Sequence, residues 1–480
     1  MIKLTESTPT TQPEACELED LKNQDQQHVW HHLTPGAAAA KGVPMFVRGE
    51  GLQLWDSDGN QYLDASAGGV WVTNVGYGRR EIADAMYQQL LELNYFAGSM
   101  ASKPATRFAT RLLEKMPGFS RVYYSSSGSE ANEKAFKMVR QISQKHYQGK
   151  KQKILYRDRD YHGTTIATLS ATGQNERRDH FGPFVPDFIA IPHCCEYRNQ
   201  YPDAEHYGLR AAQALEDVIL QEGPDTVGAV ILEPITAGGG IITPPEGYWQ
   251  HVSNICQRHN VLLIMDEVVC GLGRTGAWFG YQHFGIQPDI VTMAKGVASG
   301  YAAISCTVTS EHVYALLQES EGDTLGYFRD ISTFGGCLAG QAAALANLEI
   351  IERENLVDNS ARMGKRLLDG FRTLAEHYPM IGDVRGMGLF AGIELVEDKV
   401  TKVPVHERIP TAIAAECKQR GLLIGRTNRS MSGYNNILNF SPALIASEAD
   451  IDNIVRILDD AMAKIFSMQP AWASPNDRHY

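Results

Sequence analysis

The sequence predicts an α/β fold, in which a large domain carries a mostly parallel sheet between layers of helices and a smaller α+β domain follows it. Two observations predict this arrangement. Between residues 119 and 310, continuous apolar segments alternate with amphipathic segments of helical period, which is typical of a parallel sheet covered on both faces. After about residue 340, two long helical patterns precede short strands and a final helix, which indicates the smaller domain.

The elements are expected in the following order. Residues 1–24 are polar and acidic and predict a mobile tail. Residues 25–75 form a segment that joins the small domain and contains a β-hairpin at 43–64, because two alternating strands flank a turn signal at 58–60. The large domain then occupies 76–345 and the small domain 346–480.

Within the large domain, a helix is expected from Glu81 to Leu93. The expected strands there are 121–127, 153–158, 227–234, 261–268, 289–295 and 303–310, and the further helices are 129–143, 164–172 and 246–260. In the small domain, the expected strands lie within 384–396 and 437–445, and the last helix is 448–466.

Composition limits the function classes. At 480 residues the chain is long enough for two to three domains, and 43% hydrophobic with 21% charged residues excludes bulk disorder. A formal net charge of −12 argues against a nucleic-acid partner and fits a cytoplasmic protein. The eight cysteines form no C-x-x-C or zinc spacing, so we expect reduced thiols and no metal. No uncharged segment is apolar enough to span a bilayer, so no membrane partner is expected.

Polar residues follow five of the expected strands. Ligands bind at the carboxyl ends of parallel strands, so these residues mark a candidate site. They are Ser125 to Glu130, Tyr161 with His162 and Gly163, Glu233 with Pro234, Asp266 with Glu267, and Lys295.

The segment Ser127, Gly128 and Ser129 lies between a strand and the start of a helix. Glycine allows close approach of a ligand, and the free amides and dipole of a helix N-terminus favour an anion such as phosphate. The alternative is an ordinary N-cap, since Ser followed by Glu is a common helix start.

Three further strand-end residues have complementary chemistry. Asp266 ends an apolar strand, where a carboxylate must be paired, for example with a protonated pyridine nitrogen; otherwise it caps the next turn. A partly buried Lys295 would be a nucleophilic amine, and the alternative is a solvated lysine. Tyr161 offers an aromatic face for a ring. With a phosphate anchor, these groups are the set that pyridoxal 5′-phosphate (PLP) requires.

Two other motifs are weaker. Residues 271–276 spell G-x-G-x-x-G, but no amphipathic helix follows directly, and Asp289 precedes its strand where a dinucleotide fold needs an acid at the strand end. His28, His31 and His32 have helical spacing suited to a metal, but no matching ligand set accompanies them, so packing or capping roles are favoured.

The order of the motifs resembles that of class III (ω-type) aminotransferases of PLP fold type I, over about residues 25 to 465. The motifs are 127–133 (SGSEANE), 161–163 (YHG), Glu233-Pro234, 266–276 (DEVVCGLGRTG), 294–296 (AKG) and 333–336 (TFGG). The resemblance implies a seven-stranded sheet in the large domain and PLP as cofactor. Segments 29–35, 69–78, 156–174 and 422–426 are similar to those of the taurine–pyruvate and ω-amine:pyruvate subgroup.

The resemblance also implies roles for single residues. Lys295 would bind the cofactor covalently and shuttle the proton, while Asp266 would hold the pyridinium nitrogen. Thr333 would reach the phosphate of a neighbouring subunit, so a homodimer or a dimer of dimers is implied. The remaining implied cofactor-binding residues are Ser127, Gly128, Ser129, Tyr161, His162, Glu233 and Val268, and the implied substrate-binding residues are Trp71, Phe96, Tyr161 and Arg426.

The implied reaction is ping-pong transamination from an ω-amine donor, taurine or another small amine, to pyruvate, giving an aldehyde or ketone and alanine. The alternatives are another PLP enzyme of the same fold, such as an aminomutase, a decarboxylase or an aminotransferase using 2-oxoglutarate, or a non-catalytic relative. The chain departs from the usual motifs at 235–237, Ser332 and Cys337. These departures leave the PLP residues intact but do not support a substrate taken from ornithine- or GABA-type relatives.

Overall fold

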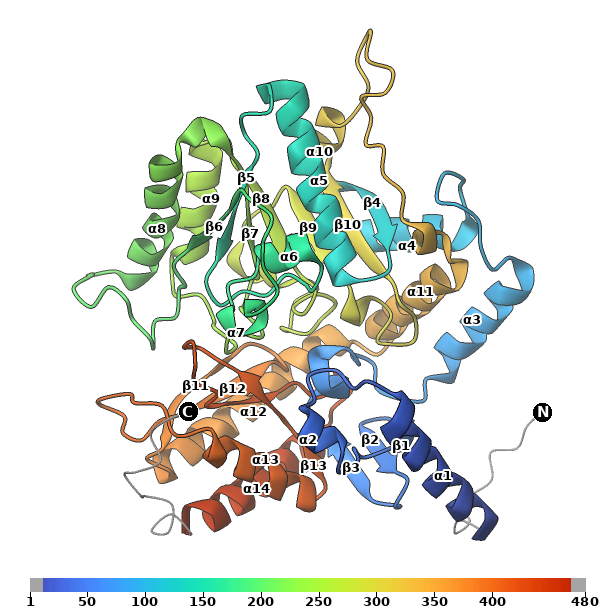
Figure 1. Ribbon diagram of the computed structural model, residues 1–480, viewed down its shortest axis with the longest axis vertical. Coiled ribbons are helices and arrows are strands. Elements are labelled where there is room, and N and C mark those ends of the chain that lie inside the picture. The colour runs from blue at the N-terminus through green and yellow to red at the C-terminus, as the bar shows by residue number, and fades with distance from the viewer. Residues whose placement is uncertain (1–11, 468–480) are drawn as a thin grey trace.

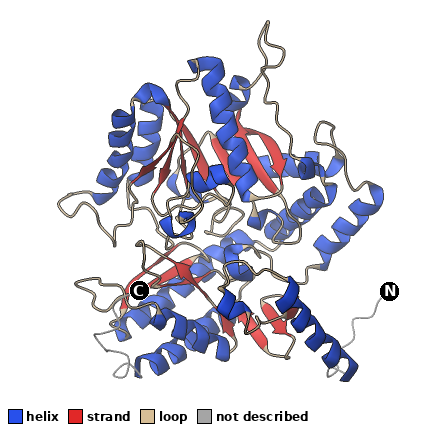
Figure 2. Cartoon of the chain, viewed as in Figure 1, coloured by secondary structure: helices blue, strands red, loops and turns tan. Residues whose placement is uncertain are grey.

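The computed structural model describes residues 12–467 and has two halves (Figure 1). The upper half in the view contains a seven-stranded sheet with helices on both sides, and the lower half contains two smaller sheets with helices around them (Figure 2). The predicted fold class is therefore confirmed. No helix among residues 12–467 is long and apolar enough to cross a membrane.

The large sheet has the strand order β4-β10-β9-β8-β7-β5-β6. Strands β9, β8, β7, β5 and β6 pair in parallel, whereas β10 is antiparallel to both of its neighbours. The bounds are β4 Phe119–Ser125, β5 Lys153–Arg157, β6 Phe188–Ile191, β7 Val227–Leu232, β8 Leu262–Asp266, β9 Ile290–Met293 and β10 Ser305–Ser310. Every residue of β7 is buried, as expected of a strand covered on both faces.

Helices of the large half lie mostly where the periodicity placed them. The sequence predicted α3 Arg80–Glu92, α5 Gly128–Tyr147, α6 Ile166–Ser170 and α9 Tyr248–Arg258, and it did not predict strand β6 or the helices α4 Lys103–Leu113, α7 Asn175–Arg178, α8 Tyr207–Glu222 and α10 Glu311–Leu316. Helix α8 packs on α9 at one end of the sheet (Figure 1).

The N-terminal strands belong to the lower half. The expected hairpin is a three-stranded antiparallel unit of β1 Phe46–Glu50, β2 Gln53–Asp56 and β3 Gln61–Asp64, because the first expected strand breaks between β1 and β2. Strand β13, Leu422–Leu423, pairs in parallel with β3. This pairing joins the N-terminal segment to the C-terminal part of the chain.

The second small sheet has the order β11-β12-β15-β14. Its strands are β11 Ile381–Gly386, β12 Ala391–Leu395, β14 Gly425–Asn428 and β15 Ile437–Phe440, and the helices of this half are α12 Leu356–His377, α13 Arg408–Gln419 and α14 Glu448–Ser467. Helix α14 packs on α12 and α13. The expected strands and last helix are thus present.

Two boundaries differ from the expectation. Helix α1, Gln12–His28, occupies much of the segment for which a tail was predicted, while residues 1–11 lie outside the described part. Helix α11, Leu338–Arg353, runs through the expected border at residue 345 and packs on α3 and α4. A short helix α2, Gly36–Ala39, follows α1.

Candidate active site

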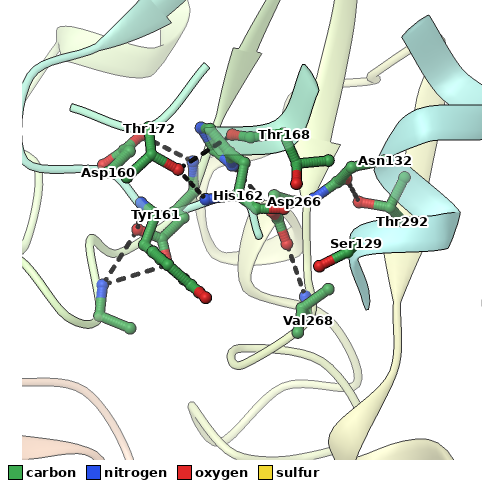
Figure 3. A network of polar contacts seen from close by, with 12 residues as sticks. Ser129, Asn132, Asp160, Tyr161, His162, Thr168, Thr172, Asp266, Val268 and Thr292 are labelled. Carbon is green, nitrogen blue, oxygen red and sulfur yellow. Dashed lines mark hydrogen bonds and ion pairs between the residues drawn. The ribbon is translucent and has the colours of Figure 1, made fainter. Parts of the chain in front are cut away.

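The strand-end residues converge at one edge of the large sheet (Figure 3). Asp266 ends β8, Tyr161 and His162 follow β5, and Glu233 follows β7. The N-terminal part of α5, which carries Ser129 and Asn132, lies on one side of the group (Figure 3). The edge faces the lower half of the molecule, so the site lies between the two halves (Figure 1).

The Asp266 carboxylate is held by three donors and is only 3% exposed. Its Oδ2 atom accepts from Asn132 Nδ2 and from His162 Nδ1, both at 2.8 Å, and its Oδ1 atom accepts from the Val268 amide at 3.0 Å. Three hydrogen bonds fix the orientation of the Asp266 carboxylate inside the site.

Sequence reasoning assigned no role to two residues of this network. Asn132 donates to the backbone oxygen of His162 at 2.7 Å as well as to Asp266, and the hydroxyl of Thr292 on β9 donates to Asn132 Oδ1 at 2.7 Å. Asn132 lies inside the SGSEANE motif, one turn into α5, and this position was the available signal. Its full burial shows that it serves the site interior.

Lys295 follows β9 and begins a short 3₁₀ helix with a backbone φ of +24°, which is strained for a residue with a side chain. Burial lowers the pKa of its amine from the ordinary 10.5, and the carboxylates of Asp266 and Glu233 partly oppose that effect. A lowered pKa increases the neutral, nucleophilic fraction of the amine. The buried-lysine interpretation is therefore favoured over a solvated surface lysine.

Glu233 contacts the backbone of Tyr161. Its carboxylate accepts from the Tyr161 amide at 3.2 Å and from the Ala237 amide at 3.3 Å. Burial, followed by the charges of Asp160 and Asp266, raises the pKa of Glu233 well above its ordinary value. Burial likewise raises the pKa of the Tyr161 phenol. Glu233 therefore holds the backbone that presents the Tyr161 ring.

A buried arginine, Arg157, stabilises the backbone at Glu233. Arg157 donates to the Glu233 carbonyl at 2.7 Å, to Thr236 Oγ1 at 3.0 Å and to Asp160 Oδ1 at 3.1 Å. Asp160 in turn accepts from the Glu233 amide at 3.0 Å. Sequence reasoning did not identify Arg157 or Asp160, because single charged residues near a strand end have no distinctive pattern.

The N-cap interpretation of the start of α5 is confirmed, and phosphate binding there stays a prediction. Ser127 is the N-cap, and its Oγ accepts from the Glu130 amide at 3.2 Å. The first amides of a helix have no intrahelical acceptor and carry its positive end, so they remain available for an anion. A Cβ on Gly128 would lie 3.0 Å from a Val268 methyl group, and Ser129 Oγ accepts from the Thr164 amide at 3.0 Å.

These residues fit PLP on observations of this structure alone. Asp266 would supply the carboxylate that a protonated pyridine nitrogen needs, Lys295 would supply the amine, and the N-terminus of α5 would bind the phosphate. The close approach of Val268 to Gly128 brings an apolar side chain to the same side as the phosphate end.

Thr333 and Phe96 lie together at a different surface. Phe96 donates its amide to the Gly336 carbonyl at 3.3 Å, in the short helix Thr333–Gly336 beside β4. Both side chains are exposed. Among the hydrogen bonds of residues 12–467, neither residue is joined to the network around Asp266.

Trp71 and Arg426 come from the lower half. Trp71 ends an irregular turn with a φ of +62°, and its Nε1 donates to Asn439 Oδ1 at 3.3 Å. Arg426 on β14 donates to Thr411 Oγ1 at 3.2 Å and lies 3.9 Å from Glu407 Oε1. The Arg426 side chain is 40% exposed and is directed to the start of α13.

The two weaker motifs have structural partners. Arg274, inside the glycine motif, is fully buried and donates to the carbonyls of Leu389 and Pro442 and to Asn74 Oδ1. The motif thus ties the two halves together and is followed by turns and a short 3₁₀ helix. His31 pairs with Asp25 at 2.7 Å. No group of three or more possible metal ligands occurs among the described residues.

Comparison with known proteins agrees with this site. The family model described as "Aminotransferase class-III" matches residues 37–462. A hypotaurine/taurine–pyruvate aminotransferase of Paracoccus denitrificans is 58% identical, over 92% of this chain and 96% of its own length.

Solved structures agree as well. A Bacillus anthracis aminotransferase superposes with a TM-score of 0.90 at 39% identity, covering 95% of this chain and all of that chain. The omega transaminase from Pseudomonas jessenii in complex with PMP (pyridoxamine 5′-phosphate) gives 0.88 at 33% identity, covering 93% and 98%. This chain belongs to the class III aminotransferases, PLP-dependent enzymes of fold type I.

Proposed function

We propose that this aminotransferase moves the amino group of a small ω-amine carrying an acid group, of the taurine or hypotaurine class, to pyruvate. Donor and acceptor are those named for the Paracoccus relative. The observation that carries the chemistry is that a partly buried lysine, Lys295, lies within electrostatic range of the triply hydrogen-bonded carboxylate of Asp266.

When bound, PLP supplies an electron sink for the bond that breaks at the substrate carbon. Asp266 keeps the pyridine nitrogen protonated, and its three donors hold the charge in place. Lys295 would take the proton from the amine-bearing carbon of the donor and return it to the cofactor. Its lowered pKa favours the neutral amine that this transfer needs.

Tyr161 and Val268 enclose the cofactor ring in this proposal. Glu233 fixes the Tyr161 backbone through its carboxylate, and Val268 is tied to Asp266 through its amide. The ring and the nitrogen partner are therefore positioned by one connected network, in which His162 holds Asp266 from the other side.

We also propose that the active unit is a homodimer in which Thr333 and Phe96 complete the partner's site. Phe334 beside Thr333 is 66% exposed, and Phe96, Met100 and Ile331 nearby are exposed apolar side chains as well. Exposed apolar clusters of this kind are typical of interfaces.

Mixing a Lys295→Ala chain with a Thr333→Ala chain tests the shared site. Heterodimers should regain activity, because one of the two sites then has both residues intact. The absence of activity in verified heterodimers would count against a shared site.

We propose a cytoplasmic location because cysteines of the chain are free thiols. The seven cysteines between Cys194 and Cys417 are free, and six of them are buried. Reduced cysteines are typical of a reducing compartment. Fractionation of the native host, followed by detection of the chain, tests this.

A donor panel tests the function. The holoenzyme is incubated with taurine, hypotaurine, β-alanine and propylamine, each with pyruvate and then with 2-oxoglutarate. Alanine should form with the acidic donors and pyruvate. Glutamate in place of alanine would identify a 2-oxoglutarate enzyme, and a rearranged amine or carbon dioxide without alanine would identify an aminomutase or a decarboxylase.

A further inference from the structure

Arg177 lies against the active-site tyrosine and has no role in the function proposed so far. It belongs to the short helix α7, at the edge of the large half that faces the small one (Figure 1). Its guanidinium carbon lies 5.0 Å from the centre of the Tyr161 ring. Its Nε atom donates to Gln174 Oε1 at 2.9 Å, and buried Gln174 donates to the Arg159 carbonyl at 2.8 Å.

The terminal nitrogens of Arg177 are open. Among residues 12–467, neither has a hydrogen-bond acceptor and no carboxylate forms an ion pair with this arginine. Two neighbouring arginines, by contrast, have partners for their terminal nitrogens. Arg178 donates to the Tyr156 hydroxyl at 2.7 Å, and Arg159 pairs with Glu176 at 3.1 Å. A partly buried guanidinium with an unused pair of N–H groups is suited to bind an anion in a bidentate way.

Arg177 is also close to the reacting amine. Its charge is among the causes that lower the pKa of Lys295, after burial and the opposing carboxylates, and it lowers the pKa of Tyr161 against the effect of burial. The unused terminal N–H groups of Arg177 therefore lie within electrostatic range of the Lys295 amine, where the donor would react. Arg426, by contrast, is already engaged with Thr411 and faces Glu407.

We propose that Arg177 binds the sulfonate, sulfinate or carboxylate group of the amine donor. The proposal rests on the proposed function, since it assumes a donor with an acid group. In taurine the sulfur is two bonds from the amine-bearing carbon, whereas the carboxyl carbon of pyruvate is bonded directly to the keto carbon. The two acids lie at different distances from the reacting carbon, so the acid group of the donor and that of the acceptor need not share one arginine, and Arg177 is the one without a hydrogen bond to its terminal nitrogens among residues 12–467.

The test uses two readouts on the PLP-loaded enzyme. The first is binding of 2-hydroxyethanesulfonate, which has the sulfonate but no amine and cannot react, measured by calorimetry. The second is the single-turnover conversion of the cofactor by taurine or by propylamine without an acceptor, which leaves the acceptor arginine out. The variants are Arg177→Gln, Arg177→Lys and, as the matched control, Arg178→Gln.

Arg177→Gln should lower the affinity for 2-hydroxyethanesulfonate and the second-order rate constant of the single-turnover reaction with taurine by roughly 10- to 100-fold each, as expected for a lost charge-assisted pair. Propylamine should change little, and Arg177→Lys should recover part of the loss. Equal losses for taurine and propylamine, or unchanged 2-hydroxyethanesulfonate binding, would overturn the proposal. If the wild-type enzyme does not use taurine, the proposed donor fails, while binding of the sulfonate and its dependence on Arg177 still decide the inference.

Discussion

The cofactor end and the substrate end of this site are built differently. At the cofactor end, Asp266, His162 and Asn132 are buried and joined by hydrogen bonds of 2.7–2.8 Å. At the substrate end, Arg426 and Arg177 come from separate short elements and are partly exposed. The residues of the cofactor end are fixed by hydrogen bonds to one another. The arginines of the proposed substrate end are partly exposed, so their present contacts could be exchanged for a ligand.

The difference suits a ping-pong enzyme. In the proposed reaction the cofactor would stay bound while two substrates with differently placed acid groups would use one pocket in turn. A rigid network preserves the electrostatics of the ring through both halves of the reaction. Exposed arginines on short elements can serve different acids with little change elsewhere. Mutations at the two ends should therefore differ in size and in substrate dependence.

The largest effect is expected at Lys295. Lys295→Ala should lower turnover by roughly 10⁴-fold or more for every donor and acceptor, because proton transfer and covalent attachment are both lost. Reduction of the wild-type enzyme with borohydride, followed by peptide mass spectrometry, should place the pyridoxyl group on Lys295. A pyridoxyl group on another lysine would contradict the assignment.

The second-largest effect is expected for Asp266→Asn. Turnover should fall by roughly 10²- to 10³-fold for all substrates alike, which is typical of removing one preorganised electrostatic contact. The amide removes the negative charge and leaves at least one of the three donors without an acceptor. Steady-state kinetics at saturating PLP separate this effect from weaker cofactor binding. A loss restricted to one donor would show that Asp266 acts on the substrate.

Arg426→Ala should reduce kcat/KM for pyruvate by roughly one to two orders of magnitude, since charge-assisted pairs contribute about 1.5–3 kcal/mol. An uncharged aldehyde acceptor with a neutral amine donor should be affected much less. Assays of the variant with both acceptors measure the difference. Equal losses would mean damage to the fold or the cofactor site, and the recognition role would have to be dropped.

Sequence reasoning located the cofactor end because its signals are local. A strand end followed by Asp, Lys or Ser-Gly-Ser places each group at the same edge of a parallel sheet, and every strand from β4 to β10 except β6 was predicted. Strand β6 has four residues and lies at the sheet edge, so its pattern is too short to detect.

The substrate end could not be derived in the same way. Trp71 and Arg426 were known only by resemblance, and the pairing of Arg426 with Glu407 depends on how α13 packs beside β14. Arg177 and Arg178 are adjacent residues of the same type, so the sequence pattern does not show which one faces the site. One side chain lies over Tyr161 and the other over Phe184, and this depends on the backbone of a four-residue helix.

The smallest effect on catalysis is expected at Glu267, the neighbour of Asp266. Its carboxyl group is 1% exposed and accepts from the amides of Gly280 and Tyr281 at 2.9 and 2.8 Å, away from the cofactor network. Glu267→Gln should change kcat/KM by less than about threefold, or roughly 0.6 kcal/mol. A loss as large as that of Asp266→Asn would extend the cofactor network to Glu267 and remove the contrast between the two carboxyl groups.

Glu267 should nevertheless be visible in stability. Burial raises its pKa from 4.5 to about 8, so the folded state binds more protons than the unfolded state between these values. The contribution of this group to stability is therefore complete below about pH 4.5 and falls as pH rises toward 8, by at most about 1.4 kcal/mol per pH unit. Denaturant unfolding across this window should show the wild-type advantage over Glu267→Gln shrinking with pH. An exposed control, Glu321→Gln, should show no such trend, and a constant difference for Glu267→Gln would mean that this carboxyl group is ionised in the folded protein throughout.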